Sequence, residues 1–97
     1  MERKIEFVVT VKKWVDRTYG NTYHSVKIED MEGNIRVSNS CCYGYDDAYK
    51  ETTLKVLHKN FLLTDVLSIR DYERVNNYPI YWNVSEGLKR EMINNVK

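Results

Sequence analysis

Two histidines and two cysteines are the residues best suited to nucleophilic or metal chemistry, because a Cys/His pair can catalyse acyl transfer and both side chains bind zinc. Cys41 and Cys42 are adjacent, however, and neighbouring side chains on extended backbone point to opposite sides. The sequence has no CxxC or HExxH spacing, phosphate-binding loop, dinucleotide fingerprint or nucleophile elbow. We therefore predict a non-enzymatic protein without catalytic residues, metal or cofactor. We interpret His24 as a hydrogen-bonded, half-buried histidine and His58 as a solvated helix residue.

Two clusters of tyrosine and glycine have more promise as a binding site: TYGNTYH at 18–24 and YGYDDAY at 43–49. Tyrosine rings offer a large contact area and a hydrogen bond at little entropic cost, as at protein interfaces. In the alternative interpretation, the glycines adopt special backbone conformations and the tyrosines plug the ends of the sheet and the helix entry. Both interpretations stay open, except that burial is favoured for Tyr49. The predicted partner-binding residues are Trp14, Tyr19, Asn21, Tyr23, Lys27, Tyr43 and Tyr45.

Aromatic rings interleaved with lysines raise the alternative of nucleic-acid binding, since such surfaces stack exposed bases. The sheet face away from the predicted helices would carry Lys12, Trp14, Tyr23, Lys27 and Tyr81. A face of this kind is more often an ordinary solvated surface or a dimer contact, and no RNP-type sequence is present. Nucleic acid is therefore the less favoured partner.

Three segments in which apolar and polar side chains alternate must position the predicted binding residues. Residues 4–15, 22–29 and 34–38 alternate apolar and polar side chains, with turn sequences around Gly20 and Gly33. They predict an antiparallel three-stranded meander, followed by a loop at 39–45.

Residues 46–61 predict an amphipathic helix that covers the meander. Asp46 is expected at or within a residue of the N-cap, with Asp47 beside the positive end of the helix dipole. Glu51, Lys55, His58 and Lys59 fall on the wet side. The core side carries Tyr49, Thr53, Leu54, Val56, Leu57 and Phe61.

The rest of the chain predicts a second helix and a fourth strand. Ser68 and Asp71 form a capping-box-like start for a helix with Ile69, Tyr72 and Val75 on one side. Residues 79–85 alternate as a strand, and the tail at 86–97 fits either a strand or a helix. The predicted fold is α+β: a mainly antiparallel sheet of about four strands with two helices packed on one face, in the order β-β-β-α-α-β.

Composition indicates a single domain over residues 1–97. The 97 residues are 42% hydrophobic, enough for one core, and the net charge of +1 provides no global field for a phosphate backbone. The sequence has no apolar run of about 18–20 residues and no signal peptide, so we expect no membrane partner and a cytoplasmic location. Pairing of an edge strand across a twofold axis into a homodimer stays open.

Three longer motifs carry a resemblance to a known group: YGNTYHSV at 19–26, YGYDDAYKETT at 43–53 and NYPIYWNVSE at 77–86. Together they span most of the chain. They resemble short, uncharacterised proteins of bacteriophages and related mobile elements, which share a YGYG-x-x-Y-x-x-TA pattern. Asp46 stands where that pattern has its second glycine, and it would alter the helix entry if glycine's freedom is needed there.

The resemblance implies an origin in phages or mobile elements, and that origin suggests a function. Small phage proteins without catalytic motifs are frequently inhibitors or modifiers of host machinery, including anti-CRISPR and other counter-defence proteins. The expected partner is thus a host or defence protein, such as a CRISPR effector, bound in the host cytoplasm. A nucleic-acid-binding module, and a binder of nucleotide-like small molecules using the tyrosines and His24, are the alternatives.

Overall fold

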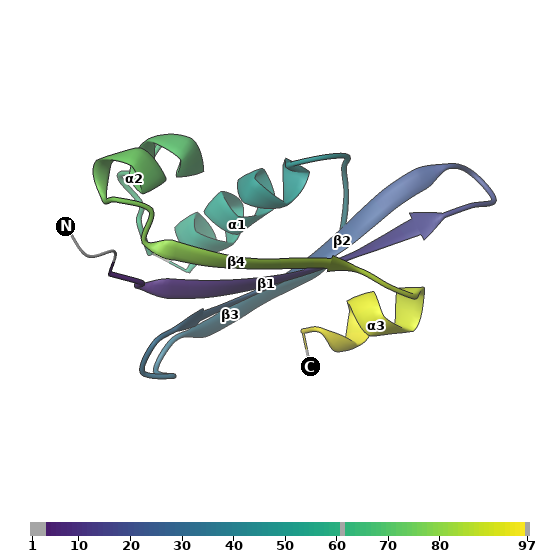
Figure 1. The fold of residues 1–97 in the computed structure, drawn as a ribbon, viewed down its shortest axis with the longest axis horizontal. Helices are drawn as coiled ribbons and strands as arrows, with labels where there is room; N and C mark the ends of the chain where they lie inside the picture. The colour runs from purple at the N-terminus through teal and green to yellow at the C-terminus, as the bar shows by residue number, and fades with distance from the viewer. Residues whose placement is uncertain (1–3, 61, 97) are drawn as a thin grey trace.

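A four-stranded mixed sheet forms the centre of the fold, with its strands in the order β3-β2-β1-β4 (Figure 1). The computed structural model describes residues 4–60 and 62–96. Its elements are β1 (Phe7–Asp16), β2 (Asn21–Asp30), β3 (Arg36–Tyr43), α1 (Ala48–Lys59), α2 (Ile69–Val75), β4 (Ile80–Glu86) and α3 (Lys89–Asn94). Helices α1 and α2 lie on one face of the sheet and α3 lies on the other. The predicted α+β class is confirmed.

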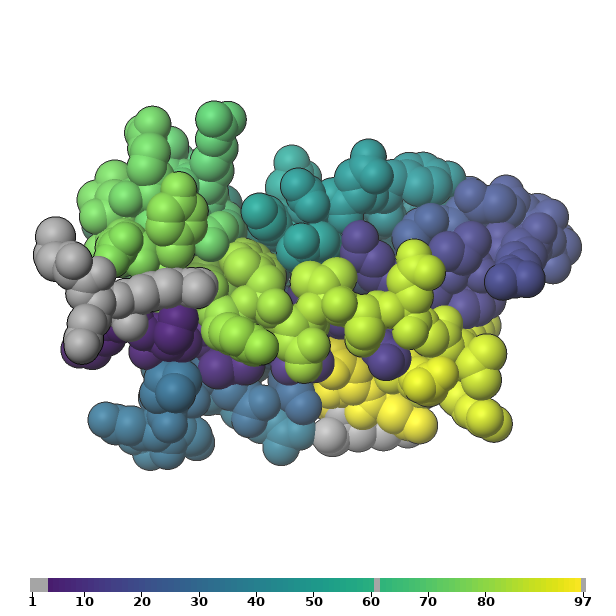
Figure 2. Space-filling model, in the orientation of Figure 1, coloured from purple at the N-terminus to yellow at the C-terminus, as the bar shows by residue number. Residues whose placement is uncertain are grey.

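The order of the strands follows from their connections. The short turns after β1 and β2 make antiparallel pairs, whereas the two helices between β3 and β4 carry the chain back across the sheet. Strand β4 therefore lies parallel to β1, with Phe7 opposite Ile80. In the space-filling view, β4 crosses the front between α1 and α2 above and α3 below (Figure 2).

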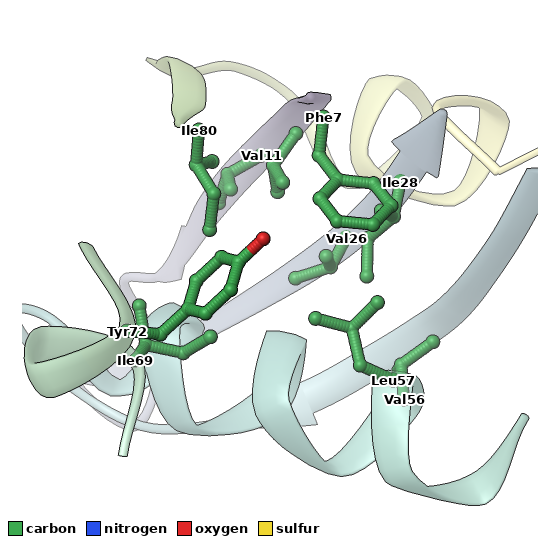
Figure 3. Close-up of a cluster of buried hydrophobic side chains, with 10 residues drawn as sticks. Phe7, Val11, Val26, Ile28, Val56, Leu57, Ile69, Tyr72 and Ile80 are labelled. Carbon is green, nitrogen blue, oxygen red and sulfur yellow. The ribbon is translucent and has the colours of Figure 1, made fainter. Parts of the chain in front are cut away.

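The core lies between the sheet and the first two helices (Figure 3). Val9, Val11, Val26 and Ile28 are fully buried because the period-two pattern turns them all to the α1 side. Leu57 of α1 is fully buried against them. The predicted core side of α1 is confirmed at Val56 and Leu57, and Tyr49 and Leu54 pack partly buried against the same cluster. The expected core residue Phe61 lies outside the described residues.

Strand β3 is longer than predicted, since residues 39–43 are strand where a loop was expected. A bulge makes this extension possible. The pairing shifts from Val26 opposite Asn39 to His24 opposite Cys42, so β3 accommodates one extra residue and still continues along β2. The extra residue interrupts the period-two alternation, so the recognisable strand pattern ends before the bulge, which is why the loop prediction was wrong.

The predicted start of α1 is confirmed to within one residue, but the expected capping hydrogen bond does not form. Asp47 is the N-cap, one residue later than Asp46, and its side chain makes no capping hydrogen bond. Asp46 instead has a φ of 51°, in the left-handed region that glycine adopts with least strain. Asp46 thus holds a backbone conformation that glycine would adopt with less strain.

The prediction of α2 is confirmed at its start and wrong for one side chain. The Ser68 hydroxyl accepts a hydrogen bond from the Asp71 N–H at 3.1 Å, and Ile69 and Tyr72 are buried. Val75, expected beside them, is exposed, and Glu73 is buried in its place. The Glu73 carboxylate accepts from the Trp82 indole N–H at 3.0 Å, and this bond explains why a charged residue lies inside.

The tail forms α3, which packs on the sheet face that was expected to be open. Met92 is fully buried, and its carbonyl accepts a hydrogen bond from the Ser25 hydroxyl at 2.6 Å. The Asn95 amide donates to the Thr10 carbonyl at 3.0 Å, which ties the end of the helix to β1. The expected open face is therefore covered along its middle. Within the described parts of the chain, no helix has the length and apolar character needed to span a bilayer.

Candidate functional site

Four aromatic rings form a row at one end of the sheet, which we call the aromatic ladder: Trp14, Tyr23, Tyr43 and Tyr45. Trp14 stacks on Tyr23 with ring centroids 5.5 Å apart. Tyr23 meets Tyr43 edge to face at 5.7 Å, and Tyr43 meets Tyr45 in the same manner at 5.5 Å. These separations and orientations are those of favourable aromatic pairs, each worth about 0.5–1.5 kcal/mol beyond area burial.

Strand register explains why residues from three distant segments meet here. Trp14 lies opposite Tyr23 in the β1–β2 pair, and Tyr23 lies opposite Tyr43 in the β2–β3 pair. Side chains that are directly opposite on neighbouring strands share one face and touch. The two tyrosine and glycine clusters of the sequence therefore merge into one surface.

The hydroxyls at the outer end of the ladder are joined by hydrogen bonds. The Tyr43 hydroxyl donates to the Tyr45 hydroxyl at 3.2 Å, and the Tyr45 hydroxyl donates to the Gly20 carbonyl at 3.1 Å. The bond to Tyr45 is the main cause that raises the pKa of Tyr43 above its ordinary value of 10. Both rings are thus held in place, and Tyr43 stays protonated at neutral pH, as suits recognition better than nucleophilic attack.

Helix α3 closes the inner end of the ladder. The Lys89 ammonium lies 5.3 Å from the centroid of the Trp14 ring, within reach of a cation–π interaction. Beside Trp14 is a cleft of about 530 Å³, which Arg17 and Leu88 also line. Sequence reasoning assigned no role to Arg17, Leu88 or Lys89. The sequence carried no clear signal for these residues, because the tail fits either a strand or a helix.

The structure brings together most of the predicted partner-binding residues, but not all. Tyr43 and Tyr45 are 59% and 49% exposed, and Tyr19, in the turn after β1, is 78% exposed. Asn21 begins β2 beside that turn. Lys27 lies apart from the ladder, four residues further along β2, and its ammonium is 3.7 Å from the Glu29 carboxylate. Ser25, covered by α3, separates Lys27 from Tyr23.

Comparison with family models, curated proteins and solved structures finds no match.

His24 faces the opposite side of the sheet, toward α1. It is buried, and its Nε2 lies 2.7 Å from the Thr52 hydroxyl oxygen. Because the Thr52 hydroxyl donates to the Ala48 carbonyl, its oxygen is left to accept, so the tautomer with hydrogen on Nε2 fits this site. The expected hydrogen bond of His24 is confirmed, but the residue is fully buried and not half-buried, because α1 covers this face of β2.

The other candidates for metal and acid–base chemistry are dispersed. His58 is half-buried, and its Nε2 donates to the Val66 carbonyl at 2.6 Å, so the expectation of a solvated residue was wrong. The reason is the chain after α1, which folds back over the end of the helix. Cys41 and Cys42 are free thiols. In residues 4–60 and 62–96, no three histidine, cysteine or carboxylate side chains gather as metal ligands.

The buried imidazole predicts a specific pH dependence of stability. Burial, followed by the nearby charge of Lys13, lowers the pKa of His24 below its ordinary value of 6.5. The unfolded chain therefore takes up this proton at a higher pH than the folded chain, so His24's contribution to stability is complete above pH 6.5 and falls as the pH drops below it. One proton sets an upper limit of about 1.4 kcal/mol per pH unit.

Denaturant unfolding of His24→Gln at a series of pH values between 7 and 5 measures this contribution, since glutamine can still donate to Thr52. We expect a shallower loss of stability on acidification than in the unaltered chain. His58→Gln is the matched control, because it removes the other histidine and keeps His24. Equal slopes for His24→Gln and the unaltered chain would contradict the prediction.

Proposed function

We propose that this protein is a non-enzymatic binding protein that docks its aromatic ladder on a partner protein. The phage-like motifs make a host or defence factor the proposed partner class, with inhibition or modification of that factor as the outcome. We place the interaction in the host cytoplasm, where the exposed thiol of Cys41 stays reduced.

The observation that carries the proposal is the ordered and partly exposed row of rings. Rings that contact one another and share hydrogen bonds are already held in one arrangement, so a partner that binds them does not have to immobilise them. Large rings of this kind supply much of the binding free energy at protein interfaces. Tyr43 and Tyr45 present about half of their surface to solvent.

The cleft beside Trp14 adds a concave element to this surface. The residues that line it include the apolar Leu88 and the charged Asp16 and Arg17. An apolar side chain of the partner could enter between Leu88 and Trp14. A charged rim around an apolar centre is the usual arrangement of a protein interface.

Two observations make the alternative functions less favourable. The lysines proposed to hold nucleic acid already face carboxylates, with Lys12 3.9 Å from Glu91 and Lys27 3.7 Å from Glu29. A nucleotide-like ligand held by the tyrosines together with His24 would need both on one side of the sheet. His24 bonds to Thr52 under α1, whereas Tyr23 lies on the α3 side.

Differential capture from host lysate tests the proposal. The unaltered chain, Tyr43→Ala and Tyr45→Ala are each immobilised, and retained proteins are quantified, with purified defence effectors as a second source of partner. We expect one or a few proteins whose retention falls at least about tenfold in both variants, the effect of losing an interface hot spot of about 1.4 kcal/mol or more.

Tyr81→Ala is the matched control, because Tyr81 lies outside the ladder. Its exposed fraction of 54% is similar to the 59% of Tyr43. It should retain the same partner within about twofold, which corresponds to less than about 0.5 kcal/mol. Thermal unfolding of all three variants separates loss of contact from loss of fold. Capture that is insensitive to Tyr43 and Tyr45, or retardation of oligonucleotides at low salt by the ladder in place of protein capture, would overturn the proposal.

A further inference from the structure

A second surface lies at the other end of β3, on the side of the sheet edge that faces α1. There a groove of about 400 Å³ runs between β3 and the last turn of α1. Residues 36–40 line one side of it, and Val56, Lys59 and Asn60 line the other. The ladder contains only Tyr43 of this strand, so the groove is a separate candidate site.

The backbone of β3 along this groove has polar groups directed outward. The Asp30 N–H donates to the Ile35 carbonyl at 3.2 Å, which turns the backbone of residue 35 toward β2. Backbone direction alternates along a strand, so the N–H and C=O of Ser38 point away from β2, over the outer edge. Since β3 is the terminal strand in the sheet order, this edge can accept a further strand.

The sequence of β3 lacks most devices that protect an edge from pairing. Its eight residues, RVSNSCCY, include no proline, no lysine and no acidic residue. The bulge lies toward the ladder end, between the positions that face His24 and Val26, and leaves residues 36–39 in regular register. Such an edge is a site for strand addition by an extended peptide.

The charge of the residues that line the groove indicates whether an acidic or a basic peptide would bind there. Arg36 and Lys59 are the charged residues that line it, and no described carboxylate does so. The register places Arg36 opposite Glu29, on the sheet face away from α1, so Lys59 is the lining cation on the α1 side. An acidic segment would place a carboxylate against Lys59. A second copy of this chain would instead bring another Lys59 to the same edge without a lining carboxylate to face it, which is electrostatically unfavourable.

We propose that the outer edge of β3 binds an extended acidic segment of a partner protein by strand addition. The backbone of Ser38 pairs with the backbone of the segment. The ammonium of Lys59, which lines the groove at the end of α1, binds a carboxylate of the segment from that side. This inference does not depend on the ladder.

A capped, fluorescently labelled octapeptide of alternating glutamate and valine is the probe, and polarisation measures its affinity. We expect saturable binding by the unaltered chain and at least about tenfold weaker binding by Lys59→Glu, as expected for losing a charge-assisted hydrogen bond. Lys55→Glu is the matched control, since Lys55 lies one turn earlier on α1, is exposed and does not line the groove. The affinity of Lys55→Glu for the peptide should stay within about twofold of that of the unaltered chain.

Ser38→Pro tests the strand addition separately from the charge. Proline removes an N–H that the sheet does not use at an outward position of an edge strand, so the fold should persist while peptide binding is lost. Ser38→Ala keeps the N–H and should bind like the unaltered chain. Thermal unfolding of both variants confirms the fold. If Ser38→Pro does not fold, the inference is tested by the difference in peptide affinity between Lys59→Glu and Lys55→Glu.

Three results would overturn the inference. The first is no binding of the glutamate peptide, and the second is equal binding of a peptide in which lysine replaces glutamate. The third is a dimer in solution that Ser38→Pro dissociates, because a second copy would then occupy the edge. Tyr45→Ala should leave peptide binding unchanged, so failure here is distinguishable from failure of the ladder.

Discussion

Replacing Leu57 with alanine should lower the free energy of unfolding by about 2–5 kcal/mol, the range for truncation of a fully buried leucine. Leu57 has no exposed surface and lies where α1 faces Val26 and Ile28 (Figure 3). Removing its side chain leaves a cavity between the helix and the sheet that neighbours can fill only partly. In a domain of this size, each kcal/mol corresponds to about 4–8 °C in Tm, so thermal unfolding should show a fall of roughly 10 °C or more.

Leu67→Ala provides the matched control for this experiment. It is the same chemical change at a leucine that is 91% exposed, in the loop before α2. Its effect on the free energy of unfolding should stay within about 0.5 kcal/mol, as for an ordinary surface substitution. If the two variants are equally stable, α1 does not cover the sheet, and the architecture described above is wrong.

Replacing Gly44 with alanine should also destabilise the protein, by about 1–3 kcal/mol, because it overpacks the entry to α1. A Cβ added at position 44 would overlap the Cβ of Ala48, the first residue of the helix. The backbone cannot easily retreat, since the Gly44 N–H donates to the Thr22 carbonyl at 3.1 Å. Urea unfolding measures the loss.

The overlap itself is tested by the double variant Gly44→Ala with Ala48→Gly, which removes the opposing Cβ. Ala48→Gly alone should cost up to about 1 kcal/mol, from the low helix propensity of glycine. If crowding is the cause, the double variant is more stable than the sum of the two single effects predicts, with a coupling of about 1 kcal/mol or more. Strict additivity would contradict a contact between positions 44 and 48.

Most elements of the fold were predictable because each has a local cause. The alternating pattern of β1 and β2 predicted the strands, and the turn sequences predicted their reversal. The Ser68 cap predicted the start of α2. Local rules failed where a distant partner decides the outcome. Glu73 is buried because Trp82 needs an acceptor, and Val75 is exposed because the helix turns Glu73 inward.

The candidate site was predictable in composition and not in arrangement. The excess of tyrosine identified Tyr23, Tyr43 and Tyr45, but nothing local placed Tyr43 opposite Tyr23. That placement depends on a bulge that shifts the pairing of β3 with β2. The contribution of Lys89 was likewise hidden, because a six-residue helix has too few turns to establish a helical period on its own.

The amino-acid sequence by itself determined β1, β2, β4, the two longer helices and the residue types available for binding, because propensity, periodicity and capping act between near neighbours. Only the tertiary structure decided that α3 covers the second face, that four rings form a ladder, and that β3 is left at an edge beside Lys59. These features depend on strand register and on packing between segments far apart in the chain, and neighbouring residues do not specify either one.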